Sequence, residues 1–273
     1  MSTFTEPFSA SSGDPFWVGL VDDAATFPPG DAPLDAALTA YADRAGPAAR
    51  LVRSLVVRDT DLPQVPSGTP VSVALTGGAG QVHGPAQLCQ RRGLPVAGIE
   101  IALRDVDDPA GNARRVVAAV DAARGEGVLD EDTPVFVELP AVDPAYSWLA
   151  AADEVAAAEL RLKLRTGGLD PDAFPTPERL AAWIDAALDR ELPFKCTAGL
   201  HRALPHVDAD GCGHHGFLTL LAATRVAFDG GSADDVVATL RRDDATDLLA
   251  LDLAGARRWF TSFGSCSIDE PLA

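Results

Sequence analysis

Short apolar runs alternate with amphipathic stretches along almost the whole chain. Between the runs, stretches such as 112–127 and 176–191 carry apolar residues three to four positions apart, the spacing of one helix face. Alternating strands and helices indicate a parallel sheet, and eight strands in 273 residues indicate a closed (β/α)8 barrel. The eight runs with strand character are 16–21, 51–57, 70–75, 96–103, 134–139, 159–165, 193–198 and 258–264.

Two parts of the chain fit this alternation less simply. Residues 76–95 show little helical pattern, and the glycine-rich stretch 71–84 departs from a dinucleotide-binding fingerprint at His83, while Pro85 disturbs the helix that such a site needs. We therefore interpret it as a loop. Residues 201–216 are expected to form a lid loop in a long insertion between the seventh and eighth strands.

No linker, repeat or charge block divides the chain. We therefore expect one barrel domain over residues 1–273, with a flexible N-terminal segment over 1–14.

Composition and charge exclude several classes of protein. A net charge of −18 argues against a nucleic-acid partner, because binding phosphates requires a basic face. No run of about 18 apolar residues is present, which argues against a membrane span. The polar, acidic start of the chain lacks the features of a signal peptide, and the four cysteines form no C-x-x-C pair. These features predict a cytoplasmic protein.

Strand alternation assigns several charged side chains to the barrel interior. Because successive strand residues face opposite sides, the leucines at 160, 162 and 164 face the helices and the charges between them face inward. Asp22 and Asp23, at the end of the first strand, fit a catalytic role or a turn. Burying charge is costly unless the charges are paired or used, which favours function over a structural ion network. The expected interior set is Glu100, Glu138, Lys163, Arg165 and Lys195, with Thr197 beside Lys195.

Lys163 and Lys195 are the two lysines of the chain, which has 22 basic residues, and both stand in short apolar strands followed by Thr and Gly. A second cation nearby, together with desolvation, lowers the pKa of a lysine. The neutral amine then attacks a carbonyl group and forms a Schiff base. We expect Glu100 or Glu138 to move the protons that this chemistry requires.

Three short motifs near these lysines resemble a known family. The segments "LKLRTGG", "FKCTAG" and "SFGSCS" are similar to the last strand ends of class I aldolases of the deoxyribose-phosphate aldolase type. The resemblance implies that Lys163 forms the Schiff base, that Lys195 tunes it, and that backbone near the last strands holds a phosphate. Arg165 and the long stretch after the seventh strand depart from the family pattern. "DDAATFPPG" and "FGSCSIDEP" also look like an uncharacterised bacterial protein family.

The first hypothesis is therefore an aldolase-type lyase that acts on a small anionic carbonyl compound. Lys163 is its expected nucleophile, Lys195 its pKa tuner, and Glu100 or Glu138 its proton shuttle. No cofactor and no metal ion is expected in this hypothesis, and a homo-oligomer is one option for the assembly. The expected substrate-binding residues are Arg165, Gly167, Gly168, Thr197, Gly199, His201 and Ser265.

Two other hypotheses remain open. A metal-dependent isomerase or lyase on the same barrel would use Glu100, Glu138 and His201 as ligands. The segment 201–217 holds four of the five histidines together with Asp208, Asp210 and Cys212, and it fits a metal site, a lid or substrate contact, or an ordinary loop. The third hypothesis is a non-catalytic barrel that acts as a binding or scaffold protein.

Overall fold

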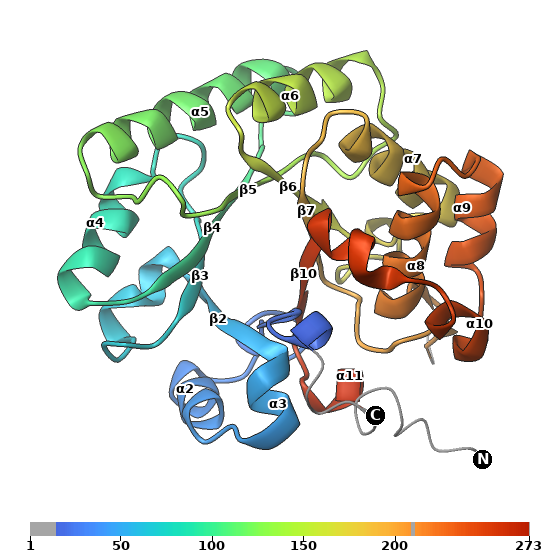
Figure 1. Ribbon diagram of the computed structural model, residues 1–273. Helices are drawn as coiled ribbons and strands as arrows, with labels where there is room; N and C mark the ends of the chain where they lie inside the picture. Colours follow the sequence, from blue (N-terminus) through green and yellow to red (C-terminus); the bar gives the residue numbers. More distant parts are fainter. Residues whose placement is uncertain (1–14, 209–210, 273) are drawn as a thin grey trace.

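The computed structural model describes residues 15–208 and 211–272. Its parallel strands close into a barrel with the helices on the outside, as Figure 1 shows. Around the barrel the strands follow the order β1-β10-β7-β6-β5-β4-β3-β2. The predicted (β/α)8 barrel is confirmed. The barrel strands are β1 Val21–Asp23, β2 Val52–Arg58, β3 Val71–Ala74, β4 Val96–Ala102, β5 Val135–Glu138, β6 Arg161–Arg165, β7 Phe194–Thr197 and β10 Phe260–Ser265.

The helices cover the outer face of the barrel (Figure 1). The α-helices are α2 Leu34–Ala42, α3 Gly46–Leu51, α4 His83–Arg92, α5 Pro109–Gly125, α6 Tyr146–Ala157, α7 Pro177–Leu188, α8 Phe217–Phe228, α9 Ala233–Leu240, α10 Ala245–Leu249 and α11 Asp269–Leu272. The 3-10 helices are η1 Pro15–Trp17, η2 Asp59–Gln64, η3 Pro171–Ala173 and η4 Leu253–Arg258.

Helix α7 illustrates how the sequence produces these elements. The Thr176 side chain accepts a hydrogen bond from the Arg179 backbone N–H, and Pro177 occupies the first turn, where its missing N–H is not needed. Leu180, Trp183 and other apolar residues at helical spacing are buried on the face toward the barrel. Burial of this apolar stripe against the sheet stabilises the helix.

Strand β6 shows how the sheet separates its two faces. Leu162 and Leu164 are buried and belong to the core between the sheet and the helices, while Lys163 and Arg165 alternate with them. The same period of two along each strand therefore brings polar side chains into the barrel interior.

The structure corrects two expectations near the N-terminal half. The first strand is not 16–21: residues 15–17 form η1, and Gly19 has a φ of 63°, which is incompatible with an extended run. Strand β1 begins at Val21 instead. Residues 76–95 do contain a helix, α4, because Pro85 lies in its first turn, where proline does not interrupt the hydrogen-bond ladder.

The long connection between β7 and β10 contains a small antiparallel sheet followed by helices α8, α9 and α10. The small sheet pairs β8 His206–Val207 with β9 Gly213–His214. Its role as a lid stays a prediction, and the segment 1–14 lies outside the described residues. Within the described ranges, no helix combines the length and the apolar character that crossing a membrane requires.

Candidate active site

Seven charged side chains form an alternating chain of cations and anions through the barrel interior. Each neighbouring pair in this chain is within ion-pair distance, and a cation stands at both ends. Every carboxylate contacts two cations. Because a cation stands at each end, this ion chain carries four positive and three negative charges. In order, its members are Arg53, Asp22, Lys195, Glu100, Lys163, Glu138 and Arg165.

Lys195, the third member of this ion chain, is enclosed by protein. Its side chain is fully buried, and its Nζ atom lies 2.6 Å from Asp22 Oδ2 and 2.6 Å from Glu100 Oε1. Nζ also lies 5.2 Å from the centroid of the Phe136 ring, within the range of a cation–π contact. Two carboxylates and an aromatic face therefore compensate the loss of water around this ammonium group.

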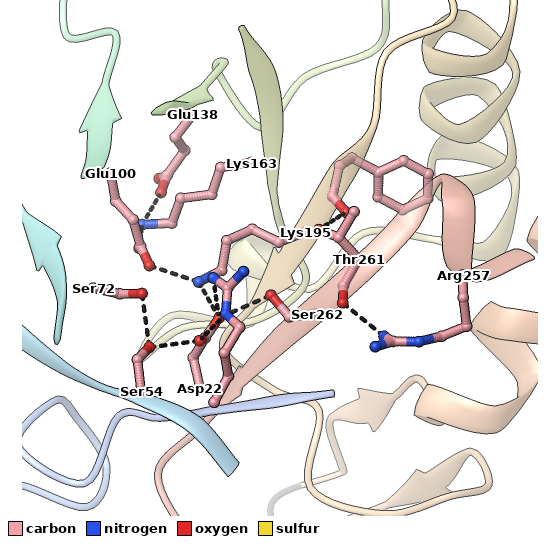
Figure 2. Close-up of polar contacts among 12 residues, drawn as sticks. Asp22, Ser54, Ser72, Glu100, Glu138, Lys163, Lys195, Arg257, Thr261 and Ser262 are labelled. Atoms are coloured by element: carbon pink, nitrogen blue, oxygen red, sulfur yellow. Dashed lines mark hydrogen bonds and ion pairs between the residues drawn. The ribbon is translucent and has the colours of Figure 1, made fainter. Parts of the chain in front are cut away.

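Lys163 lies between Glu100 and Glu138, as Figure 2 shows. Its Nζ atom is 2.8 Å from Glu100 Oε2 and 3.0 Å from Glu138 Oε2, and 12% of its side chain is exposed. Strand β6 places it directly opposite Lys195 on β7. The two amines therefore converge on one carboxylate, and Lys163 is the amine that retains access to solvent.

Asp22 is held from three further directions. Ser54 Oγ donates to its Oδ1 at 2.7 Å and Ser262 Oγ donates to its Oδ2 at 2.8 Å. Ser72 extends this network through a 2.8 Å contact with Ser54 (Figure 2). Arg53 Nε donates to Oδ1 at 3.0 Å. Side chains from β2 and β10 thus fix the carboxylate that anchors Lys195, with Ser72 on β3 supporting Ser54.

The three carboxyl groups of the ion chain, those of Asp22, Glu100 and Glu138, are held in their ionised form. Burial alone raises the pKa of Glu100, but the charges of Lys163 and Lys195 outweigh it and lower the pKa from 4.5 to about 2. Lys195 and Arg53 likewise hold the pKa of Asp22 below its ordinary value against the effect of burial. Lys163 and Arg165 do the same for the pKa of Glu138.

The pKa of Lys163 departs from the expectation drawn from the sequence. Burial alone lowers this pKa, but the negative charges of Glu100 and Glu138 outweigh burial and raise it above the ordinary value. The expected lowering by Lys195 is wrong, because the Glu100 carboxylate stands between the two ammonium groups. In the resting state Lys163 is therefore an ammonium ion.

A cavity of about 540 Å³ opens above Lys163 at the C-terminal ends of the strands. This is the face on which (β/α)8 enzymes carry their active sites, and the volume is within the range of small-molecule sites. Its lining also includes Ala24, Val56, Ala74 and Gly264, which lie in or next to barrel strands, and Phe27, Pro28 and Pro29 in the loop after β1.

The cavity brings together most, though not all, of the residues selected from the sequence. Among the residues that the structure describes, those lining the cavity do not include Lys195, Glu138, Gly167 or Ser265. The selected residues that do line it are Glu100, Lys163, Arg165, Gly168, Thr197, Gly199 and His201.

Four of the selected residues have other surroundings. Gly167 packs against the backbone of Gly199, where a Cβ atom would lie 2.8 Å from the Gly199 Cα. Ser265 Oγ donates to the Ser267 carbonyl at 2.6 Å, so it closes a turn. Lys195 and Glu138 do not line the cavity themselves, but they pair with Glu100 and Lys163, which do. Gly167 and Ser265 therefore do not line this cavity, and their role in substrate binding stays a prediction.

Arg165 lies at the cavity end of the ion chain. Its Nε atom donates to Glu138 Oε1 at 3.0 Å, and 41% of its side chain is exposed. A Cβ atom on Gly168 would lie 3.8 Å from Arg165 Nη1, so the guanidinium stands beside the glycine turn. A planar cation at the mouth of a cavity is suited to bind a carboxylate or a phosphate.

Sequence reasoning missed several residues of the site. Ser54, Ser72 and Ser262 are buried polar residues in apolar strands, and strand alternation would have assigned them to the interior once the register was known. Cys266 also lines the cavity, with its Sγ atom 3.8 Å from His201 Nδ1. His201 Nδ1 in turn lies 3.3 Å from Glu270 Oε2.

The ligand set of the metal hypothesis does not come together. The oxygen atoms of Glu100 and Glu138 face the two lysines and Arg165, and His201 faces Glu270 and Cys266. Among the described residues, no cluster of three or more His, Cys, Asp or Glu side chains is arranged to hold a metal ion. Asp210 of the histidine-rich segment lies outside those residues.

Comparison with known proteins relates this chain to others through its fold. No protein-family model and no curated protein matches the sequence. A solved structure described as the "unique tetrameric structure of deoxyribose phosphate aldolase from Aeropyrum pernix" matches with a TM-score of 0.55 and 14% sequence identity. The match covers 100% of this chain and 97% of that chain. At this identity the likeness shows a shared barrel fold.

Proposed function

We propose that this protein is an aldolase-type lyase in which the Lys163 amine forms a Schiff base with a small anionic carbonyl compound. The observation that carries the proposal is the position of Lys163, which lines a cavity at the C-terminal end of the barrel and whose Nζ atom lies within ion-pair distance of two carboxylates. The barrel shared with a deoxyribose phosphate aldolase supports the reaction class by analogy of fold. The tetrameric state of that aldolase supports a homo-oligomer as the assembly of this chain.

The ion chain suits the charge of the intermediate. Condensation of an ammonium ion with a carbonyl group yields a protonated imine and one water molecule, so the positive charge at Nζ is the same before and after the reaction. Glu100 and Glu138 pair with the ammonium now and would pair with the iminium cation afterwards. A site preorganised for this charge stabilises the intermediate without reorganisation.

Proton movement requires a temporary acceptor, because Lys163 must lose a proton before it attacks. Glu138 is the better candidate, since Glu100 is held by two ammonium groups and Glu138 by one ammonium and the guanidinium of Arg165. An anionic substrate group on Arg165 adds negative charge beside Glu138. That charge raises the pKa of Glu138 and improves it as a proton acceptor.

Lys195 acts through Glu100 in this mechanism. It fixes the position of the carboxylate and keeps it ionised, while its own burial keeps it away from the substrate. Iminium formation then acidifies the carbon next to the former carbonyl, and a carboxylate removes a proton to give an enamine. The enamine is the carbon nucleophile for bond formation, and the reverse sequence breaks the same bond.

Exchange of carbon-bound hydrogen tests the proposal without knowledge of the full substrate. Pyruvate, acetone and acetaldehyde in D2O are incubated with the protein, and loss of the methyl proton signal is followed by NMR. We expect exchange with at least one donor, and none in Lys163→Met or Lys163→Arg. Arg161→Met removes a cation from the same strand and should leave exchange unchanged. Exchange that persists in Lys163→Met, or fails with all three donors, contradicts the proposal.

A non-catalytic barrel is the second candidate, and one observation favours it. Every carboxylate of the ion chain is paired twice, as in a purely structural network, and the pKa of Lys163 is raised. This candidate predicts that the wild-type protein exchanges no donor hydrogen, so the same NMR measurement separates the two.

A further inference from the structure

The cavity above Lys163 has a charged side and an apolar side. Glu100, Lys163 and Arg165 come from β4 and β6. In the closed strand order β2 stands directly opposite β6, with β1 and β3 as its two neighbours. Residues in or next to these three strands form what we call the apolar wall, which consists of Ala24, Phe27, Pro28, Pro29, Val56 and Ala74. A molecule in the cavity therefore meets charge on one side and hydrocarbon on the other.

Hydrogen bonds and a ring contact hold the apolar wall in place. Thr26 Oγ1 donates to the Val56 carbonyl at 3.3 Å, which ties the loop after β1 to β2. The Phe27 backbone N–H donates to the Ala24 carbonyl at 2.9 Å. The guanidinium carbon of Arg58 lies 4.4 Å from the centroid of the Phe27 ring. The wall is therefore a preformed apolar surface, and a ligand that packs on it does not have to order the loop first.

The cavity offers few side chains that could bind hydroxyl groups of a substrate. Of the described residues that line it, none is serine, asparagine, glutamine or tyrosine. Both oxygens of Glu100 already contact lysines, and the hydroxyl oxygen of Thr197 is itself buried. Apart from Lys163 and Arg165, the polar side chains that remain are Asp170, His201 and Cys266. A compound with several hydroxyl groups would lose their water in this cavity and gain few partners.

The size and the rim of the cavity also favour a hydrocarbon group. Its volume of about 540 Å³ lies in the range of sites for drug-sized ligands, so a three-carbon oxo acid leaves part of it unfilled. Leu169 lines the cavity and keeps 75% of its surface exposed. A hydrocarbon group in the cavity would remove this apolar surface and that of the apolar wall from water, which is favourable.

We propose that the substrate carries a hydrocarbon group of several carbons that packs on the apolar wall, while its anionic group binds Arg165 and its carbonyl carbon bonds to Lys163. The inference rests on the proposed function and narrows its substrate class to oxo acids with an alkyl or aryl chain. Each methylene group that the wall buries raises the affinity roughly fourfold. Hydroxyl groups on the same chain would be left without partners and lower it.

Three 2-oxo acids test this selectivity. 2-Oxobutyrate, 2-oxohexanoate and 2-oxo-4,5,6-trihydroxyhexanoate share the carboxylate, the carbonyl group and the methylene beside it. Reductive trapping on Lys163 with cyanoborohydride is quantified by mass spectrometry, and the concentration dependence of labelling gives an apparent affinity. 2-Oxohexanoate has two more methylene groups than 2-oxobutyrate, so we expect it to bind roughly tenfold more tightly. The trihydroxylated acid has the same carbon number and should show no such gain.

Substitutions on the apolar side test where the chain binds. Phe27→Ser should reduce the advantage of 2-oxohexanoate over 2-oxobutyrate roughly fivefold, and Phe27→Leu should retain most of it. Leu169→Ser changes an exposed residue, which leaves folding intact, and should reduce the advantage roughly twofold. Leu249→Ser is the matched control, because Leu249 is exposed outside the cavity, and it should leave the advantage unchanged. A ratio of two acids within one variant cancels effects on the reactivity of Lys163.

The failure of the inference and the failure of the proposed function give different results. Equal affinities for 2-oxobutyrate and 2-oxohexanoate, with Lys163 labelled by both, overturn the inference and leave the proposed function standing. A higher affinity for the trihydroxylated acid than for 2-oxohexanoate does the same, as does an unchanged ratio in both Phe27→Ser and Leu169→Ser. Absence of label on Lys163 with all three acids overturns both.

Discussion

Glu100 holds Lys195 with one carboxylate oxygen and Lys163 with the other, at 2.6 Å and 2.8 Å. The two amino groups therefore contact the same carboxylate, which lies between them. This arrangement keeps Lys163 charged at rest and positions it between two proton acceptors. Control of Lys163 depends in this account on the carboxylates around it, and Lys195 contributes by fixing one of them.

Removal of the Glu100 charge should destabilise the protein strongly. In Glu100→Gln two buried ammonium groups lose their shared anion, and a buried ion pair broken on one side costs roughly 3–5 kcal/mol. The free energy of unfolding from urea titration measures this loss. Glu154→Gln is the matched control, because Glu154 pairs with the exposed Arg114, and it should change stability by less than about 1 kcal/mol. Equal effects of the two substitutions would contradict the buried network.

Stability should fall in acid because of the same carboxylate. The pKa of Glu100 is about 2 in the folded protein against an ordinary value of 4.5, so its contribution is complete above 4.5 and is lost as pH falls toward 2. The difference corresponds to roughly 3 kcal/mol. Tm measured from pH 6 to pH 2 should decline in this window. The decline should be shallower in Glu100→Gln, and parallel curves would contradict the assignment.

The pH dependence of Schiff-base formation should respond to Glu138. Its negative charge raises the pKa of Lys163, so Glu138→Gln lowers that pKa and increases the fraction of neutral amine at a given pH. We expect the pH profile of imine formation to move toward lower pH by about one unit. The maximal rate should fall at the same time, because the proton acceptor is lost. A profile that keeps its midpoint would show that Glu138 does not control Lys163.

Arg165 should determine the preference for anionic compounds. In Arg165→Met the apparent affinity for pyruvate should fall roughly tenfold relative to that for acetone, because a charge-assisted hydrogen bond is lost. Acetone serves as the internal control for effects transmitted through Glu138. Arg165→Lys should give an intermediate result, since a single ammonium cannot make the bidentate contact. An unchanged pyruvate-to-acetone ratio would assign the anion to another group.

The barrel and the inward direction of its charges followed from the sequence for simple reasons. Leucines alternate with charges in β6, and a period of two leaves one choice of face once the helices are known to cover the outside. The same rule located Glu100, Glu138 and Lys195. These are local properties of single strands.

The order of charges across strands did not follow from the sequence. That Glu100 stands between the two lysines depends on the relative positions of β4, β6 and β7 in the closed barrel. The pKa of Lys163 was therefore predicted with the wrong sign, because proximity of the amines was considered without the anion between them. From the sequence, Asp22 was placed only at the end of the first strand. In the structure β1 begins at Val21, later than expected, and Asp22 lies in the buried interior.

Reductive trapping tests the central claim most directly. The protein is incubated with a panel of small aldehydes and 2-oxo acids in the presence of borohydride, digested and mapped by mass spectrometry. The account predicts a reduced adduct on Lys163 and none on Lys195, because the first lines the cavity and the second is fully buried. A panel that leaves Lys163 unmodified, or that modifies Lys195 in its place, would contradict it.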